Sequence, residues 1–196
     1  MTTLGTHNLL DGKAPATDLA EVIFYTEAKG PYGAVGKTHA VYVCAKQRDL
    51  VIAVNRKLGW EFEEHYKPAH WGSRKVSPHR GTYYLVDHKA KVVLIDEHRI
   101  NAAFEPFKRG EKLFRKLAWW VHTQNTLRII RRYKKRGYTV HAGGDLNTPV
   151  GVSGYKGTLN EVGRKYDRLG STEKLTKARR TPRLGSDHFG LKAEAG

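Results

Sequence analysis

The sequence predicts an α/β fold, a mixed sandwich of sheets and helix, from three observations. Short runs of strand-forming residues are spread over the whole chain, turn signals such as Asp11-Gly12 separate them, and one long helical pattern covers residues 110–135. Many short strands with one long helix between them are typical of layered mixed folds. The 196 residues show no repeat and no compositional break that would mark a linker, so we expect a single domain over 1–196.

The expected strands are short runs rich in β-branched and aromatic residues, at 4–10, 22–25, 40–44, 50–54, 60–63, 82–86, 91–95, 138–142, 166–169 and 186–192. Residues 22–25 are continuously apolar, as in a buried strand, whereas 4–10 is expected at a sheet edge. Residues 82–86 and 91–95 predict a hairpin. The pair 40–44 and 50–54 fits a hairpin, which we favour, or a helix edge followed by a strand.

The long helical pattern predicts one core-facing stripe. Its members recur at steps of three and four, and they are Leu113, Leu117, Trp120, Gln124, Leu127, Ile130 and Lys134. The other face is rich in Arg and Lys and is expected to be solvated, and Gly137 follows as a C′ glycine. We expect helical turns at 16–21, loops at 65–81 and 171–184, and an irregular Gly-rich segment at 150–165.

The charge balance predicts a polyanionic partner. Thirty-five Lys and Arg against 19 Asp and Glu give a net charge of +16, which favours nucleic acid first and an anionic membrane surface second. Cys44 is the only cysteine, so an internal disulfide is excluded. The first residues have no basic and apolar leader, and no apolar run approaches the roughly 20 residues of a membrane span. We therefore expect a cytoplasmic protein without a membrane partner.

Polar residues fall at or near the ends of the expected strands, and they are Asn8, Glu27, His98, Asp145, Asn147, Asp167, Asp187 and His188. Each one alone fits a turn residue, a cap or a surface side chain. Together they match what metal-assisted phosphodiester cleavage needs: oxygen ligands for a hard cation, a group that takes a proton from water, and donors for the phosphate. We therefore predict metal-assisted cleavage of a phosphate ester, in nucleic acid.

The order of these motifs resembles the endonuclease/exonuclease/phosphatase superfamily, which includes deoxyribonuclease I-like enzymes and abasic-site endonucleases. The matching segments are His7-Asn8-Leu9-Leu10, Thr26-Glu27, Glu97-His98, Gly144-Asp145-Leu146-Asn147, Tyr166-Asp167-Arg168-Leu169 and Ser186-Asp187-His188. Two positions depart from the family pattern. Thr26 stands where the family usually has Gln, and Glu97 stands where it has Thr, next to the central histidine.

The resemblance implies a four-layer sandwich of two packed β-sheets flanked by helices, with the site at one end. It implies Mg²⁺, with Mn²⁺ or Ca²⁺ also suited to oxygen ligands, held by Glu27, Asn8 and Asp187. Asp167 would orient His188, and either His188 or Asp145 would act on the attacking water, an alternative left open. Asn147 would donate to the phosphate or hold Asp145. His98 would be a phosphate-side donor or the general acid.

Basic residues outside these motifs are candidates for holding the phosphate backbone, and they are Arg80, Lys177, Arg179, Arg180 and Arg183. The expected partner is nucleic acid, DNA more than RNA, and no protein partner is inferred. Endonuclease and exonuclease activity both fit. Two alternatives remain: a phosphatase acting on a phospholipid head group or a small phosphate ester, and a nucleic-acid-binding protein that has lost catalysis.

Overall fold

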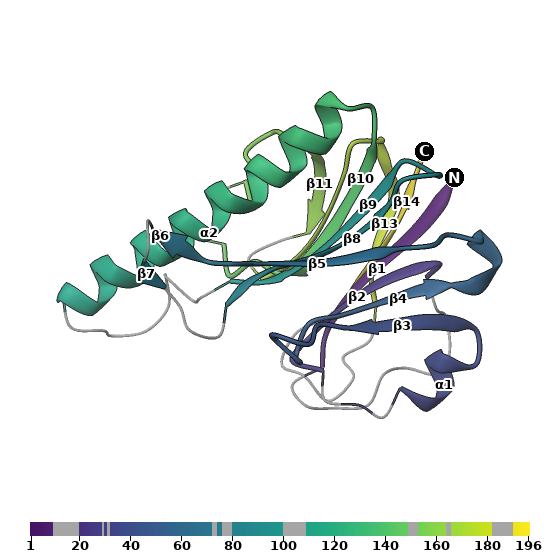
Figure 1. The fold of residues 1–196 in the computed structure, drawn as a ribbon, viewed down its shortest axis with the longest axis horizontal. Coiled ribbons are helices and arrows are strands. Elements are labelled where there is room, and N and C mark those ends of the chain that lie inside the picture. Colours follow the sequence, from purple (N-terminus) through teal and green to yellow (C-terminus); the bar gives the residue numbers. More distant parts are fainter. Residues whose placement is uncertain are drawn as a thin grey trace.

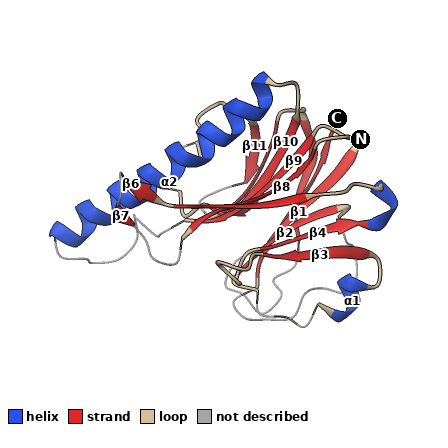
Figure 2. Cartoon of the chain, viewed as in Figure 1, coloured by secondary structure: helices blue, strands red, loops and turns tan. Residues whose placement is uncertain are grey.

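The structure, a computed structural model, describes residues 1–9, 20–28, 30, 32–71, 74–75, 80–99, 109–148, 153–163, 166–181 and 190–196. Within these ranges two six-stranded mixed sheets pack against each other, and helix α2 (Arg109–Lys135) covers the outer face of one of them (Figure 1). The short helix α1 (Gly33–Gly36) packs through Val35 on the outer face of the other sheet. The predicted α/β sandwich is confirmed, and strands dominate it (Figure 2).

The first sheet has the order β13-β14-β1-β2-β4-β3. Its strands are β13 (Leu175–Thr181), β14 (Gly190–Ala195), β1 (Thr2–Asn8), β2 (Val22–Thr26), β4 (Val51–Asn55) and β3 (His39–Val43). The β3–β4 hairpin is confirmed. The prediction of an edge strand at 4–10 is wrong, because β1 lies between β14 and β2. Its small and polar residues Gly5 and Thr6 are fully enclosed, so low apolar content did not indicate exposure.

The second sheet has the order β11-β12-β10-β9-β8-β5. Its strands are β11 (Asn160–Gly163), β12 (Asp167–Ser171), β10 (Thr139–Asp145), β9 (Val92–His98), β8 (Gly81–Asp87) and β5 (Glu63–Pro68). The β8–β9 hairpin is confirmed. Strands β9 and β10 are parallel and in register, so His98 lies opposite Asp145 at their carboxyl ends.

Several boundaries differ from the prediction. Trp60 and Phe62 are half-buried against the core, as their alternation indicated, but they follow the 3₁₀ turn Arg56–Leu58 and precede β5. The expected loop 65–81 contains the end of β5 and a small ribbon of β6 (His70–Trp71) and β7 (Arg74–Lys75). The irregular segment after 150 contains β11. Pro68 did not break β5, because β5 is an edge strand where a missing N–H costs no ladder bond.

The expected basic loop at 171–184 is also wrong, since residues 175–181 form the edge strand β13. Lys177, Arg179 and Arg180 are exposed along it. Lys and Arg are common on sheet edges, where they oppose pairing with another chain, so a basic run does not exclude a strand. The expected helical turns at 16–21 and the beginning of the expected strand 186–192 lie largely outside the described residues.

Two apolar cores separate the layers. Between the sheets, Leu4, Phe24, Ile52, Leu85 and Leu94 are buried together. Between the second sheet and α2, the packed residues include Val93, Ile95, Leu127, Ile130 and Val140. No described helix is both long enough and apolar enough to span a membrane.

The buried face of α2 is not the predicted stripe over its whole length. Leu127 and Ile130 are buried as expected, but Leu113 is 70% exposed and Trp120 is 46% exposed. In their place the helix buries Trp119, His122, Thr123 and Thr126. A search for apolar periodicity missed this face because three of the four side chains are polar. Gly137 ends the helix region with a φ of 78°, as a C′ glycine does.

Candidate active site

Four of the predicted site residues converge where strands of both sheets end. Asn8 is the last residue of β1, Glu27 follows β2, His98 ends β9 and Asp145 ends β10. Asn8 Nδ2 donates to Asp145 Oδ2 at 3.4 Å. His98 Nε2 lies 3.6 Å from Glu27 Oε1 and 3.8 Å from Asp145 Oδ2. The carboxyl ends of two parallel strand pairs, one in each sheet, thus form one polar cluster.

Glu27 is the most open member of this cluster. Asn8, His98 and Asp145 are at most 5% exposed, whereas 29% of the Glu27 side chain is exposed. Glu27 has a φ of 53°, a left-handed conformation that costs energy for a residue with a side chain. The backbone is held on both sides, because Leu9 N–H donates to Thr26 O and Ala28 N–H donates to Asp49 O. Glu27 therefore presents a carboxylate at the mouth of a site whose other groups are enclosed.

Asp49 belongs to the cluster although no sequence motif indicated it. Its Oδ2 lies 3.3 Å from His98 Nδ1 and 3.4 Å from Arg80 Nη1, and Arg80 also contacts His98 Nδ1 closely. Burial acts to raise the pKa of Asp49, but the hydrogen bond and charge interaction with His98, together with the Arg80 cation, lower it overall. The sequence shows Asp49 only as a polar residue in the β3–β4 turn. Arg80, predicted to hold phosphate, lies inside the site.

His98 consequently has carboxylates at both ring nitrogens. Asp49 faces Nδ1, while Glu27 and Asp145 face Nε2. Such a pairing fixes the ring plane and directs Nε2 toward the part-exposed Glu27 carboxylate. The ring can therefore exchange a proton or donate a hydrogen bond at Nε2 while Asp49 holds the other side.

The corner after β10 is fixed by hydrogen bonds from three other segments. Asn147 N–H donates to Asp145 Oδ1 at 3.0 Å, and Asn147 Nδ2 donates to Arg99 O at 2.9 Å. Arg99 N–H donates to Asp145 O at 2.9 Å, and Trp119 Nε1 donates to Leu146 O at 2.8 Å. Leu146 N–H is accepted by Tyr166 O. The side-chain amide of Asn147 thus donates to the protein backbone, which favours a role in holding Asp145.

The two glycines before Asp145 are required by close packing. A Cβ on Gly143 would lie 2.3 Å from the ring of Phe24. Gly144 has a φ of 130°, and a Cβ there would lie 2.1 Å from Glu97 O. Their absence of side chains lets β10 approach both β2 and β9, so that Asp145 reaches Asn8 and His98.

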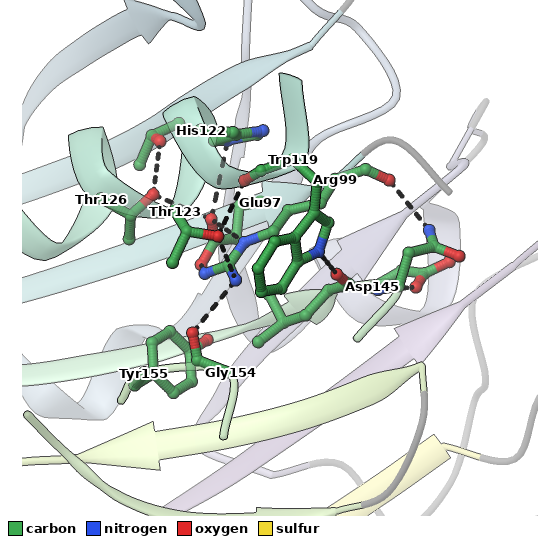
Figure 3. A network of polar contacts seen from close by, with 12 residues as sticks. Glu97, Arg99, Trp119, His122, Thr123, Thr126, Asp145, Gly154 and Tyr155 are labelled. Atoms are coloured by element: carbon green, nitrogen blue, oxygen red, sulfur yellow. Dashed lines mark hydrogen bonds and ion pairs between the residues drawn. The ribbon is translucent and has the colours of Figure 1, made fainter. Parts of the chain in front are cut away.

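Glu97 and Arg99, the neighbours of His98 in the chain, form a buried ion pair (Figure 3). Successive strand residues point to opposite faces, so these two side chains face α2 while His98 faces the site. Arg99 is fully buried; its Nε and Nη2 donate to Glu97 at 3.0 and 2.8 Å, and its Nη1 donates to Thr123 Oγ1 and Gly154 O. Trp119 and Tyr155 flank the guanidinium.

The charge of Glu97 is therefore buried and paired with Arg99, although Glu97 stands where the family usually has threonine. Burial opposes its ionisation, but Arg99, His122 and the hydrogen bond from Thr126 outweigh burial and lower the pKa of Glu97. Thr126 Oγ1 donates to Glu97 Oε2 at 2.8 Å, and His122 Nε2 lies 3.6 Å away. The side chains between β9 and α2 thus stabilise the additional carboxylate at this position.

The remaining predicted residues differ in their placement. Asp167 begins β12 directly opposite Asp145 and is 6% exposed. Lys177 Nζ is paired with Glu194 at 3.0 Å, so an intramolecular partner already binds it. Arg179 and Arg180 precede Thr181, whose hydroxyl lies 3.5 Å from Nδ1 of His7, the neighbour of Asn8. Arg183, Asp187 and His188 lie outside the described residues, and their roles stay predictions.

The donor chemistry of the cluster fits a hard cation. Asn8, Glu27 and Asp145 offer amide and carboxylate oxygens, which Mg²⁺, Mn²⁺ and Ca²⁺ all accept. Among the described residues, no three His, Cys, Asp or Glu side chains are grouped so that they alone could hold a metal ion. The amide of Asn8 falls outside that set of residue types, and Asp187 falls outside the described ranges.

Comparisons of sequence and of structure give different results. No protein-family model matches the sequence, and no curated protein matches it. Truncated TDP2 from Caenorhabditis elegans is similar in structure, with a TM-score of 0.64 and 18% identity over 98% of this chain and 96% of that chain. The 3′ phosphatase NExo from Neisseria, bound to a product DNA hairpin, has a TM-score of 0.64 and 10% identity over 100% of both chains.

An AP endonuclease from Archaeoglobus fulgidus is also similar, with a TM-score of 0.58 and 12% identity over 100% of this chain and 99% of that one. At 10–18% identity these likenesses concern the fold. Two packed six-stranded sheets, with polar residues gathered where their parallel strands end, agree with them. The chain therefore has the DNase I-like α/β sandwich fold that the resemblance of its motifs implied.

Proposed function

We propose that this protein is a divalent-metal-dependent phosphodiesterase that hydrolyses nucleic acid, DNA rather than RNA. The observation that carries the proposal is the cluster of Asn8, Glu27, His98 and Asp145 from both sheets, in which Asn8–Asp145, His98–Glu27 and His98–Asp145 lie 3.4, 3.6 and 3.8 Å apart. The net charge of +16 supports a polyanionic substrate. Similar structures include a 3′ phosphatase bound to DNA and an AP endonuclease, which act on phosphate esters of DNA.

Glu27 and Asn8 are the described residues that would hold the ion, Mg²⁺ or otherwise Mn²⁺ or Ca²⁺, and the resemblance adds Asp187. Glu27 suits this role because its carboxylate is partly open to solvent, whereas the other members of the cluster are enclosed. A bound divalent ion would polarise the phosphoryl oxygens and offset the charge that builds on them.

His98 and Asp145 would do different work on the substrate. Asp49 holds Nδ1 of His98, so Nε2 remains for a hydrogen bond to the phosphate or for protonation of the leaving oxygen. Both oxygens of Asp145 accept hydrogen bonds, Oδ1 from Asn147 N–H and Oδ2 from Asn8 Nδ2, which fixes the carboxylate where a water can be oriented. Either Asp145 or His188, oriented by Asp167, accepts the proton of that water.

The test compares cleavage of supercoiled plasmid and of a labelled single strand with Mg²⁺, with Mn²⁺ and with EDTA. We expect cleavage that EDTA abolishes and that falls by about 10²-fold or more in Glu27→Gln and His98→Ala. Glu61→Gln makes the same chemical change as Glu27→Gln at an exposed position before β5 and should leave the rate unchanged.

Other outcomes select the alternatives. Cleavage that persists in EDTA, or equal rates for Glu27→Gln and Glu61→Gln, would contradict the proposed site. Salt-sensitive retention of DNA without any cleavage would identify a binding protein. Hydrolysis of phospholipid head groups or small phosphate esters alone would identify the phosphatase alternative.

A further inference from the structure

The outer face of the C-terminal half of α2 carries five exposed cations, Arg128, Arg131, Arg132, Lys134 and Lys135, here called the basic helix face. From the sequence alone, this face is expected only to be solvated. We infer that it is a second binding surface for the backbone of nucleic acid, separate from the candidate active site. The inference rests on the proposed function only for the identity of the polyanion.

The cations of the basic helix face have no carboxylate partner within the described part of the fold. None of the five takes part in an ion pair there, and α2 contains no acidic residue after Glu111. Glu63 acts electrostatically on Tyr133 of the same helix, but its ion pairs are with His65 and His88. The polar contacts of Arg128 and Lys134 are to neutral groups, Oδ1 of Asn125 and the carbonyl of Thr158.

The spacing of these cations is unfavourable within the protein. Arg128 and Arg132, and Arg131 and Lys135, are separated by four residues, so like charges stand next to each other on one helix face and destabilise it. The helix dipole favours cations in the last turn, which accounts for Arg132, Lys134 and Lys135. It does not account for Arg128 and Arg131, which lie one to two turns earlier. A bound polyanion would remove the repulsion at all of these positions.

The shape of the surface suits a phosphate backbone more than a membrane. Residues 128–135 cover about 10 Å of helix, which faces about three phosphates of one DNA strand. A helix lying in a membrane surface needs apolar residues on its exposed face. In this half of α2 the apolar residues Ile129, Ile130 and Tyr133 are buried in the core instead. The exposed apolar side chains Leu113, Phe114 and Trp120 all lie in the other half.

The basic helix face lies at the far end of the second sheet from the candidate active site. The chain passes from Lys135 through Gly137 directly into β10, and Asp145 is at the other end of that strand (Figure 1). Seven strand residues span about 20 Å. Nucleic acid can therefore occupy this surface whether or not the site is filled, so retention and cleavage should be separable.

The test measures binding of a 30-base-pair duplex, a length chosen to be about 100 Å, in EDTA over a series of salt concentrations. Arg128→Gln/Arg131→Gln/Lys135→Gln removes three charges from the basic helix face. Lys37→Gln/Arg56→Gln/Lys57→Gln removes three charges from exposed positions around the β3–β4 hairpin. We expect the slope of log K against log salt to become less steep by about 2 to 3 in the first variant only, because each phosphate contact contributes about 0.9.

Equal slopes for the two triple variants, or a wild-type protein that does not retain the duplex, would overturn the inference. So would loss of binding to phosphatidylserine vesicles with unchanged DNA binding, which would identify a membrane surface. Hydrolysis of bis(p-nitrophenyl) phosphate by the first variant should match the wild type. If the wild type cleaves nothing but the slope changes as expected, the proposed function fails and this surface stands.

Discussion

The imidazole of His98 contacts residues from four segments of the chain. Its ring contacts Asp49 from the β3–β4 turn, Glu27 just after β2, Asp145 at the end of β10 and Arg80 just before β8. Neither Asp49 nor the exact position of Arg80 was predictable from sequence, because an acid in a polar turn carries no signal of what lies opposite it in space. The residues with motifs, Asn8, Glu27, His98 and Asp145, were predicted to lie at strand ends, and they do.

Asp49→Asn tests whether Asp49 orients His98. The substitution keeps the size of the side chain but weakens its hold on Nδ1, so we expect a lower kcat with little change in KM. The loss should be smaller than the ~10²–10⁴-fold expected for removing an acid–base group entirely, as in His98→Ala. Steady-state kinetics and the pH profile of kcat provide the measurement. An unchanged pH profile and an unchanged kcat would show that Asp49 has no such role.

Burial of His141 leads to a prediction of how the free energy of unfolding depends on pH. It is 1% exposed, hydrogen-bonded to Ser171, and burial lowers its pKa from 6.5 to about 4. Because the pKa of His141 is lower in the folded than in the unfolded protein, the contribution of this residue to the free energy of unfolding is fully present above pH 6.5. That contribution, about 3 kcal/mol, is lost as the pH falls from 6.5 toward 4. His141→Gln should therefore flatten the fall in stability between pH 6.5 and 4, measured by urea denaturation.

Ser171→Ala is the matched control for His141→Gln. It removes the hydroxyl partner of His141 without removing the titrating group, so it should cost stability at every pH and retain the acid slope. Identical slopes for His141→Gln and the wild type would mean that other groups cause the acid sensitivity. His122, whose pKa burial also lowers to about 4, is then the next residue to replace.

At the scale of elements, α2 has two roles that one apolar stripe does not describe. Its C-terminal half closes an apolar core, while its middle turns support the site through hydrogen bonds. Trp119 and Thr126 donate to Leu146 O and Glu97, and Thr123 accepts from Arg99. Sequence periodicity finds the first role, because burial there is apolar. It misses the second, because the polar side chains on that buried face find their hydrogen-bond partners in Glu97 and Arg99, which lie far away in sequence.

Trp119→Phe tests the support that α2 gives to the corner after β10. The change keeps an aromatic ring beside Arg99 but removes the hydrogen bond from Nε1 to Leu146 O, which leaves a buried carbonyl without that donor. We expect a loss of about 1–3 kcal/mol of stability and a fall in kcat at nearly constant KM. Ile129→Val, a similarly buried change elsewhere on α2, should lower stability without changing kcat. Equal kcat for both variants would contradict the idea.

For the whole molecule, the fold was easier to predict than its boundaries. Alternation and apolar runs located the hairpins, β2 and the C-terminal half of α2, because these segments bury apolar residues. β1 and β13 were misassigned because small, polar or basic residues fill them, and only the neighbouring strands decide whether such a segment is central, exposed or irregular. The convergence of the site required knowing which strands are parallel neighbours, which the chain order alone does not determine.

The pairing of β1 with β14 has a consequence for how the molecule is made. These strands come from opposite ends of the described chain, yet they pair antiparallel inside the first sheet, from Thr2 opposite Ala195 to Thr6 opposite Leu191. During synthesis on a ribosome, β1 cannot pair with β14 until residues 9–189 have been made. The second sheet and α2 use only residues 63–171, so this half can form before β14 is synthesised, whereas the first sheet is completed later.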